Sequence, residues 1–416
     1  MKKIALTLLI VSIVTISKGS RTHPPGNLTK PFVKASQESI DTPRIPLVAI
    51  LAIPENLTNV SRYKQLRASG ITYSYYSFSN ANAMQAALDV GQKTGIKLFV
   101  ACPELTSDPE TTVKRFMNHP ALAGYFISDE PSRSRFSKLG ELVKKIRAID
   151  DKHLCYINLF PNYQVEKYLG AKNYDEYLDR YLNEVPSQVI SFDNYPITGP
   201  KRESVRKEFY QNLEVVSAAS KKSGRPFWGF ALSVTQPPFP VPTLGALKLQ
   251  VYSNLAYGAQ GIEYFTYWTP ATPQFNTAAI GKDGKETEVY PRLQQVNKEV
   301  TALSGVFLGA KMISVSHTGA VLPPGTRPLG NLPKPIASLK TDGIGALVSV
   351  MKNNGKSYIV IVNHDFTSPM NMMIRCMPGV TRIQKDGSAV AQNLYTNKVT
   401  IDPGDVAIYS WPDSMN

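Results

Sequence analysis

Short apolar runs alternate with longer amphipathic segments over most of the chain. Nearly continuous apolar runs are typical of strands buried on both faces, and apolar residues at helical spacing are typical of the helices that cover them. We expect strands at residues 47–53, 71–77, 97–102, 122–127, 154–159, 189–192, 226–232 and 261–268. We expect helices near residues 59–69, 82–94, 109–118, 135–149, 174–183, 202–223, 244–257 and 291–303.

Eight strand–helix units in succession predict an α/β fold, a closed (β/α)8 TIM barrel over residues 46–312. An open doubly wound sheet is the alternative for such a pattern, but no glycine-rich phosphate loop follows the first strand. The length of 416 residues agrees with a barrel, which takes about 250 residues, followed by a small second domain.

The pattern changes after the barrel. Residues 313–340 are rich in Pro and Gly and are predicted to be a linker. Further apolar runs follow, separated by turn signals, at residues 344–351, 356–362, 370–376 and 406–411. They predict a small C-terminal antiparallel β-sandwich over residues 341–416.

The N-terminus has the pattern of a secretory signal. Lys2 and Lys3 precede an apolar run at residues 4–16, which is shorter than the roughly 20 residues needed to span a bilayer. We therefore expect a signal peptide at residues 1–20 and a Pro-, Ser- and Thr-rich leader at residues 21–45. No later stretch is apolar enough to cross a membrane, so we expect an exported protein without a transmembrane segment in its mature form.

The composition and charge of the chain limit the kinds of partner that we expect. Three Cys form no motif, which argues against a disulfide framework and favours a bacterial periplasm or extracellular location. The five His are scattered, so we predict no metal site, and we expect no cofactor. The net charge of +14 is spread along the predicted helices, where solvated charge explains it without nucleic acid. If the charge serves binding, an acidic polysaccharide or anionic surface is the favoured partner.

The candidate chemistry lies where the fourth strand ends, in Ser128-Asp129-Glu130-Pro131. Active sites of (β/α)8 barrels lie at the C-terminal ends of the strands. Two adjacent carboxylates directly after an apolar strand are costly unless they are used. Cleavage of a glycosidic bond needs an acid for the leaving oxygen and a second carboxylate, and Glu130 is the candidate acid. The alternative is a helix cap, with Asp129 or Ser132 at the N-terminus of the next helix.

Other strand ends carry polar and aromatic side chains that suit a sugar. Asp193 after the sixth strand is the candidate second carboxylate, although a Pro-terminated turn would also explain its neighbourhood. The predicted sugar-binding residues are amides and aromatic side chains, namely Asn158, Asn194, Tyr195, Trp228, Tyr267 and Trp268. Further residues expected at the mouth are Tyr75, Glu104 and Asn162. Aromatic residues could equally fill the barrel.

The chain resembles the retaining barrel glycosidases, most nearly the bacterial β-galactosidase-like proteins related to glycoside hydrolase family 42. The resemblance rests on Ser128–Pro131, Phe192–Pro196 and Gly261–Trp268 and covers roughly residues 45–305. It implies that Glu130 is the acid/base. It also implies two departures: Asp129 stands where the family has Asn, and residues 227–236 lack the nucleophilic Glu expected on the seventh strand.

Three hypotheses follow from these departures. The first is hydrolysis with Glu130 as acid and Asp193 as base or nucleophile; Asp129 and Glu104 are the other candidates for the second carboxylate, which could also be absent. The second is substrate-assisted hydrolysis, because an adjacent Asp-Glu pair after the fourth strand resembles the N-acetylhexosaminidase arrangement. The third is a carbohydrate-binding barrel without catalysis. Glu263, at the start of the eighth strand, is expected to form a buried structural ion pair instead of replacing the nucleophile.

Overall fold

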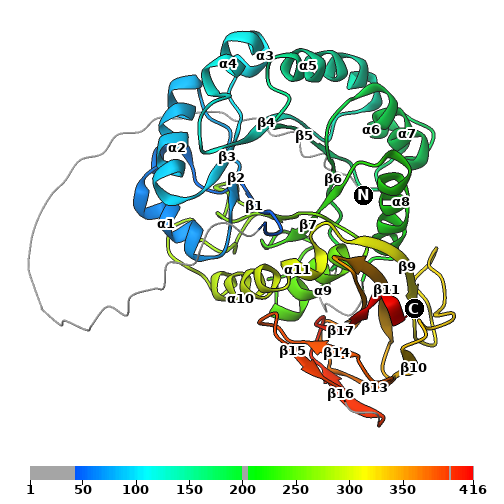
Figure 1. Ribbon diagram of the computed structural model, residues 1–416. Helices are drawn as coiled ribbons and strands as arrows, with labels where there is room; N and C mark the ends of the chain where they lie inside the picture. Colours follow the sequence, from blue (N-terminus) through cyan, green and yellow to red (C-terminus); the bar gives the residue numbers. More distant parts are fainter. Residues whose placement is uncertain (1–42, 199–204, 393–394, 416) are drawn as a thin grey trace, which may run out of the picture. The chain divides into compact units, whose positions relative to one another are not determined.

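The computed structural model describes residues 43–198, 205–392 and 395–415. Eight parallel strands form a closed barrel in chain order, which confirms the predicted fold class (Figure 1). They are β1 Leu47–Ile50, β2 Tyr73–Ser74, β3 Lys97–Val100, β4 Leu122–Asp129, β5 Leu154–Leu159, β6 Ile190–Phe192, β7 Phe227–Leu232 and β8 Ile262–Phe265. The expected signal peptide and nearly all of the expected leader lie outside the described residues. The leader's last residue, Ile45, is packed in the core.

Helices surround the strands, and local signals set their ends. They are α1 Val60–Ala68, α2 Ala81–Thr94, α3 Glu104–Ser107, α4 Pro109–Phe116, α5 Phe136–Ile149, α6 Glu166–Leu169, α7 Tyr174–Glu184, α8 Glu208–Ser223, α9 Leu244–Ala256, α10 Val289–Ala302 and α11 Ser304–Phe307. In α2, the Asn80 side chain accepts hydrogen bonds from two backbone N–H groups at the first turn, and Gly95 ends the helix at φ 72°. None of the described helices is long and apolar enough to cross a bilayer.

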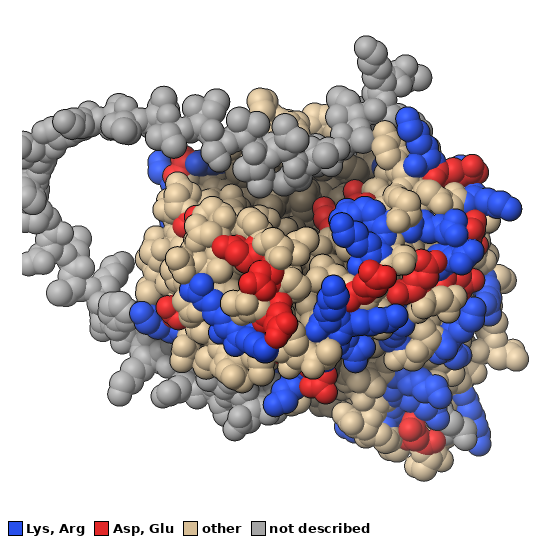
Figure 2. Space-filling model, turned by 90° about the horizontal axis from the view of Figure 1, so that it is seen from above, with Lys and Arg blue, Asp and Glu red and all other residues tan. Residues whose placement is uncertain are grey.

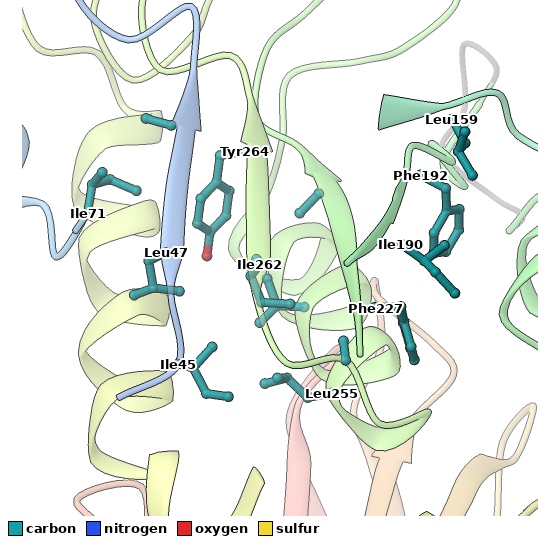
Figure 3. Packing of buried hydrophobic residues seen from close by; sticks show 14 of the residues in the cluster. Ile45, Leu47, Ile71, Leu159, Ile190, Phe192, Phe227, Leu255, Ile262 and Tyr264 are labelled. Carbon is teal, nitrogen blue, oxygen red and sulfur yellow. The ribbon is translucent and has the colours of Figure 1, made fainter. Parts of the chain in front are cut away.

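Two apolar layers hold the barrel together, and strand alternation separates them. The outer layer lies between strands and helices and includes Leu47 and Ile262, with Tyr264 donating to Asn297 of α10 at 2.7 Å (Figure 3). The inner layer fills the barrel with larger side chains, among them Phe99 and Trp228. The filled interior leaves the strand ends as the place for polar chemistry.

The predicted β-sandwich follows the barrel. One sheet has the order β10-β13-β16 (Ile336–Thr341, Met370–Cys376, Asn397–Ile401). The other has the order β15-β14-β17-β12-β11-β9 (Ala389–Ala391, Thr381–Ile383, Val406–Pro412, Lys356–Asn363, Ala346–Asn353, Lys311–His317). The structure therefore differs from the expected linker at residues 313–340, because β9 and β10 both reach into it. Helix α9 contacts β11 and β12, so the sandwich packs on the barrel.

Charged side chains of both signs are spread over the face of the molecule shown in Figure 2, where Lys and Arg lie among Asp and Glu.

A buried cluster of ion pairs joins the barrel to the sandwich. Lys248 of α9 lies 3.0 Å from Glu299 of α10 and 2.7 Å from Asp405, which precedes β17. Lys385 also pairs with Asp405.

We expect Lys248→Met to lower the free energy of unfolding by about 3 kcal/mol, because the buried carboxylates of Glu299 and Asp405 are then left with Lys385 as their shared cation. Urea denaturation followed by circular dichroism measures this change. The matched control is Lys114→Met, which breaks the exposed pair with Glu110 on α4 and should have little effect. Equal losses in the two variants would contradict the structural role of the cluster.

Candidate active site

The ends of β4, β5 and β6 bring together the residues that the sequence singles out most strongly. In the closed barrel, Asp129 is in register with Asn158, and Asn158 is in register with Ser191. The Asn158 amide donates to Asp129 Oδ1 at 3.0 Å and to Asp193 Oδ1 at 3.4 Å. One buried amide therefore connects both aspartates.

The backbone at Glu130 directs its side chain away from the path of the strand. The register of β4 against β5 shifts between Phe126 and Ser128. Glu130 then adopts φ 38°, the left-handed region that non-glycine residues rarely occupy, while its N–H donates to the Asn158 carbonyl oxygen at 2.9 Å. Irregular pairing and backbone strain concentrate at functional sites.

Glu130 and Asp193 interact closely. Each carboxyl group acts on the pKa of the other, so the two do not both ionise near neutral pH. Burial, followed by the charges of Asp193 and Asp129, holds the pKa of Glu130 well above its usual range. Burial also raises the pKa of Asp193, but the hydrogen bond from Asn158 opposes that rise. Glu130 is therefore the member of the pair that keeps its proton longer.

Asp129 completes the group in a different environment. Its side chain is exposed to solvent, yet desolvation raises its pKa, and the hydrogen bond from Asn158 partly offsets the rise. Both observations fit a carboxylate that protein atoms closely surround but that water still reaches. None of the ion pairs within the described residues involves Asp129, Glu130 or Asp193. The same residues contain no cluster of side chains arranged to hold a metal.

An aromatic platform borders the carboxyl groups. The rings of Tyr75 and Phe126 are stacked with centroids 3.9 Å apart, and both side chains are half-buried. The charge of Asp129 contributes to raising the pKa of Tyr75, which places the ring near that carboxylate. The sequence named Tyr75 but missed Phe126.

A second aromatic contact places a cation near Asp193. The Arg206 guanidinium lies over the Tyr163 ring, 3.9 Å from its centroid. Burial, then the charge of Asp193, raises the pKa of Tyr163, whereas Arg206 lowers it. Neither residue was predicted, because both follow strand ends in loops without a recognisable motif.

Beneath the carboxyl groups the barrel holds a buried polar layer. The Ser191 Oγ lies 3.2 Å from Asn158 Oδ1, which can only accept from it, 2.7 Å from Glu263 Oε2 and 2.9 Å from Tyr156 Oη. Glu263 is fully buried and forms no ion pair among the described residues. The expected ion pair of Glu263 is therefore corrected: its partners are hydroxyl groups.

The other predicted residues after β6 point into the protein. Asn194 is buried, and its amide donates to Asn212 of α8 at 3.0 Å and to Asn162 at 3.4 Å. Tyr195 is buried and stacks on Phe265. These side chains support the loop that carries Asp193.

The predicted aromatic sugar contacts are not gathered at the carboxyl groups. Trp228 fills the barrel interior beside Tyr73 and Phe99. Tyr267 is 1% exposed, and Trp268 is 6% exposed with Arg62 over its ring. Little of their surface is open to a ligand.

Two alternatives for the second carboxylate can be located. Glu104 accepts a hydrogen bond from the backbone N–H of Ala81 at 3.0 Å, at the start of α2. At the end of β7 stands Ser233, which donates to the Thr266 carbonyl oxygen at 2.9 Å, and residues 233–236 carry no carboxylate. The carboxyl groups of the site are thus confined to the ends of β4 and β6.

Comparison with protein families now bears on the class of activity. Residues 145–303 match the family model of glycoside hydrolase family 42, described as beta-galactosidase. The matched segment contains Asn158, Asp193 and Glu263, whereas Asp129 and Glu130 precede it. This match relates the second half of the barrel to glycoside hydrolase family 42.

Solved structures share the fold at low identity. A beta-galactosidase from Bacillus circulans sp. alkalophilus is 11% identical over 89% of this chain and 99% of that chain, with a TM-score of 0.59. The alpha-amylase from Geobacillus thermoleovorans, complexed with acarbose, is 10% identical over 88% and 98%, with a TM-score of 0.52. A beta-galactosidase from the psychrophilic Marinomonas ef1 is 12% identical over 62% of this chain and 60% of that chain, with a TM-score of 0.44. The match thus spans less than two thirds of that protein. No curated protein sequence matches the chain.

The raised pKa of Glu130 gives a stability prediction. A carboxyl whose folded pKa exceeds its unfolded value of 4.5 stabilises the fold fully below that pH, and the contribution is lost as the pH rises. We expect Glu130→Gln to match the parent near pH 4.5 and to exceed its free energy of unfolding by about 2 kcal/mol or more near pH 8. Urea denaturation at both pH values measures this.

Glu110→Gln, an exposed change on α4, is the control and should show no such trend. A constant difference between the parent and Glu130→Gln across this pH range would show that Glu130 ionises normally in the folded protein.

Proposed function

From this relationship to glycoside hydrolase family 42 we propose that the protein hydrolyses a glycosidic bond in an oligosaccharide or polysaccharide, with Glu130 as the general acid. The observation that carries the proposal is the burial of Glu130 beside Asp193 and Asp129, which keeps the proton on Glu130. Hydrolysis of a glycoside needs a carboxylic acid that keeps its proton near neutral pH and transfers it to the leaving oxygen. Burial and neighbouring charge favour that form of Glu130.

Asp129 is the second carboxylate in this proposal, and Asp193 holds the proton on Glu130. The two reacting carboxyl groups are about 5–5.5 Å apart in retaining enzymes and about 6.5–9.5 Å apart in inverting ones. Asp193 is buried and accepts from the Asn158 amide, so it is the poorer candidate to meet water or sugar. Asp129 is exposed, so water or the anomeric carbon can reach it.

A substrate-assisted reaction is the second candidate. The end of β7 offers no carboxylate, and Asp129 stands directly before the acid. An N-acetyl group on the substrate would then supply the attacking oxygen, while Asp129 accepts a hydrogen bond from the N–H of that group. Cleavage restricted to N-acetylated substrates favours this version, and NMR of the first-formed anomer separates retention from inversion in either case.

Export belongs to the same proposal. The basic and apolar pattern at residues 1–20 supports it, together with the low cysteine content. A polysaccharide outside the cytoplasm is then an accessible substrate.

We expect Glu130→Gln to lower kcat/KM on natural glycans by about 10²–10⁴-fold, because the leaving oxygen is no longer protonated. On dinitrophenyl glycosides, whose leaving group needs no proton, bond cleavage should stay near the parent rate. A screen of dinitrophenyl glycosides that begins with the β-galactoside supplies the substrate for this comparison.

Glu110→Gln is the matched control and should keep full activity. Equal losses on both kinds of substrate would remove Glu130 from the acid role. Sugar binding by the parent without turnover of any substrate would identify a binding barrel instead.

We also propose that the substrate carries negative charge. A cavity of about 540 Å³, which none of the three carboxyl groups lines, carries the cations Arg206 and Lys207 beside Tyr210 and Phe366. Arg206 forms no ion pair within the described part of the chain, and it lies over the Tyr163 ring near Asp193. Asp365 also lines the cavity, but its carboxylate accepts hydrogen bonds from its own turn. A sugar carboxylate or sulfate would therefore meet an available guanidinium.

Arg206→Met should raise KM for an anionic oligosaccharide roughly tenfold and leave KM for its neutral counterpart unchanged. Steady-state kinetics at low and high salt measure the effect, which added salt should reduce in the parent. Lys221→Met, at the far end of α8, is the matched loss of one positive charge. A parent that prefers the neutral substrate would contradict the proposed charge.

A further inference from the structure

A buried chain of hydrogen bonds connects Glu263 with the two aspartates. Glu263 Oε2 lies 2.7 Å from Ser191 Oγ, and Ser191 Oγ lies 3.2 Å from Asn158 Oδ1. The Asn158 Nδ2 reaches Asp129 Oδ1 at 3.0 Å and Asp193 Oδ1 at 3.4 Å. Each hydrogen bond joins side chains from neighbouring or facing strands, so the closed barrel fixes the positions of all these groups.

The side-chain amide of Asn158 has one orientation that satisfies this series of hydrogen bonds. Asp129 and the Asp193 oxygen it faces are acceptors, so the amide must turn its two N–H groups toward them. Its oxygen then faces Ser191, and an amide oxygen can only accept. Ser191 must therefore donate its single proton to Asn158.

That assignment determines the state of Glu263. With its proton given to Asn158, Ser191 can only accept from the carboxyl group 2.7 Å away. Glu263 must supply the proton itself, as a neutral acid. The Tyr156 hydroxyl, 2.9 Å from Ser191, donates to the remaining lone pair. If Glu263 is ionised, Ser191 turns to it and Asn158 loses its donor.

The surroundings of Glu263 favour the neutral form. The side chain is fully buried, in register with Val48 and Phe230. The titratable groups that face it are Tyr156 from β5, Asp129 at the end of β4 and Asp193 after β6. No Lys, Arg or His pairs with it among the described residues. Burial raises the pKa of Glu263 to about 8, and the hydrogen bonds that Tyr156 and Ser191 could donate to its ionised form only partly oppose that rise.

We propose that Glu263 is a positioning residue, a neutral acid that orients Ser191 and Asn158 so that both aspartates are held by the Asn158 amide. Ionisation of Glu263 would reverse the Ser191 hydroxyl, weaken the hold on Asp129 and Asp193, and add negative charge beneath them. Activity would then decline as Glu263 loses its proton. The inference rests on the proposed function, because activity is read through those aspartates.

The test is the pH dependence of kcat in Glu263→Gln. Glutamine keeps an N–H donor for Ser191 and cannot ionise, so the variant should stay active while the alkaline limb, near pH 8 in the parent, moves upward by about one pH unit or more. KM should change little. An alkaline limb that is identical in the parent and the variant would overturn the proposal.

Two further variants keep the result clear if Glu263→Gln folds poorly. Ser191→Ala removes the link while Glu263 remains, and it should lower kcat roughly tenfold with little change in KM. Ser233→Ala is the matched control, because this buried serine donates to a backbone carbonyl oxygen away from the carboxyl groups. Equal kcat values in the two serine variants would overturn the proposal.

Infrared difference spectra separate this inference from the proposed function. Between about pH 6 and about pH 9 the parent should lose a protonated-carboxyl band that Glu263→Gln lacks. The band tests Glu263 even if no substrate is turned over. Its absence in the parent would show that Glu263 is already ionised, which contradicts the proposal, whereas its presence without any turnover would contradict only the proposed function.

Discussion

Three carboxyl groups gather at one end of a closed barrel, and no described ion pair compensates them. Like charges so close together in a desolvated environment cannot all ionise near neutral pH. The structure meets this constraint in two ways: Glu130 keeps its proton beside Asp193, and Asn158 divides its two N–H groups between Asp193 and Asp129. A carboxylic acid available for proton transfer is therefore a consequence of the crowding.

The geometry of the barrel produces that crowding. Neighbouring parallel strands end at the same rim, so β4, β5 and β6 place their last inward-facing side chains together. Side chains along each strand also point alternately outward and inward. In β6, Ile190 and Phe192 pack outward against helices, while Ser191 and then Asp193 turn toward the barrel axis. The polar layer below the site and the site itself thus have one origin.

The same alternation explains what the sequence could predict. Strands buried on both faces give continuous apolar runs, so the eight strands and their order were predicted correctly, and Glu130 and Asp193 stood out as carboxylates directly after such runs. The link through Ser191 was missed, although its spacing of two residues from Asp193 was a usable signal. The strand β9 was also missed, since most of its residues are exposed or half-buried and give no apolar run.

Contacts between segments that lie far apart along the chain could not be predicted from the sequence. Trp228 was expected to meet a sugar, but a tryptophan in a barrel strand fills the interior as readily as it lines the mouth, and its neighbours decide which. Likewise, nothing near Glu263 in the sequence indicates that its partner is a serine two strands away. A buried acid without a nearby cation in sequence is better interpreted as a neutral hydrogen-bond donor than as half of an ion pair.

The arrangement of the rim also limits the chemistry. The carboxyl groups lie at the ends of β4 and β6, whereas the side of β7 and β8 presents aromatic rings, including Phe265 stacked on Tyr195. In the proposed function, a sugar would therefore meet Glu130 and Asp129 from the side of β4 and β6. Residues 233–236 at the end of β7 carry no carboxylate, so a group that attacks from that side would have to be water or part of the substrate.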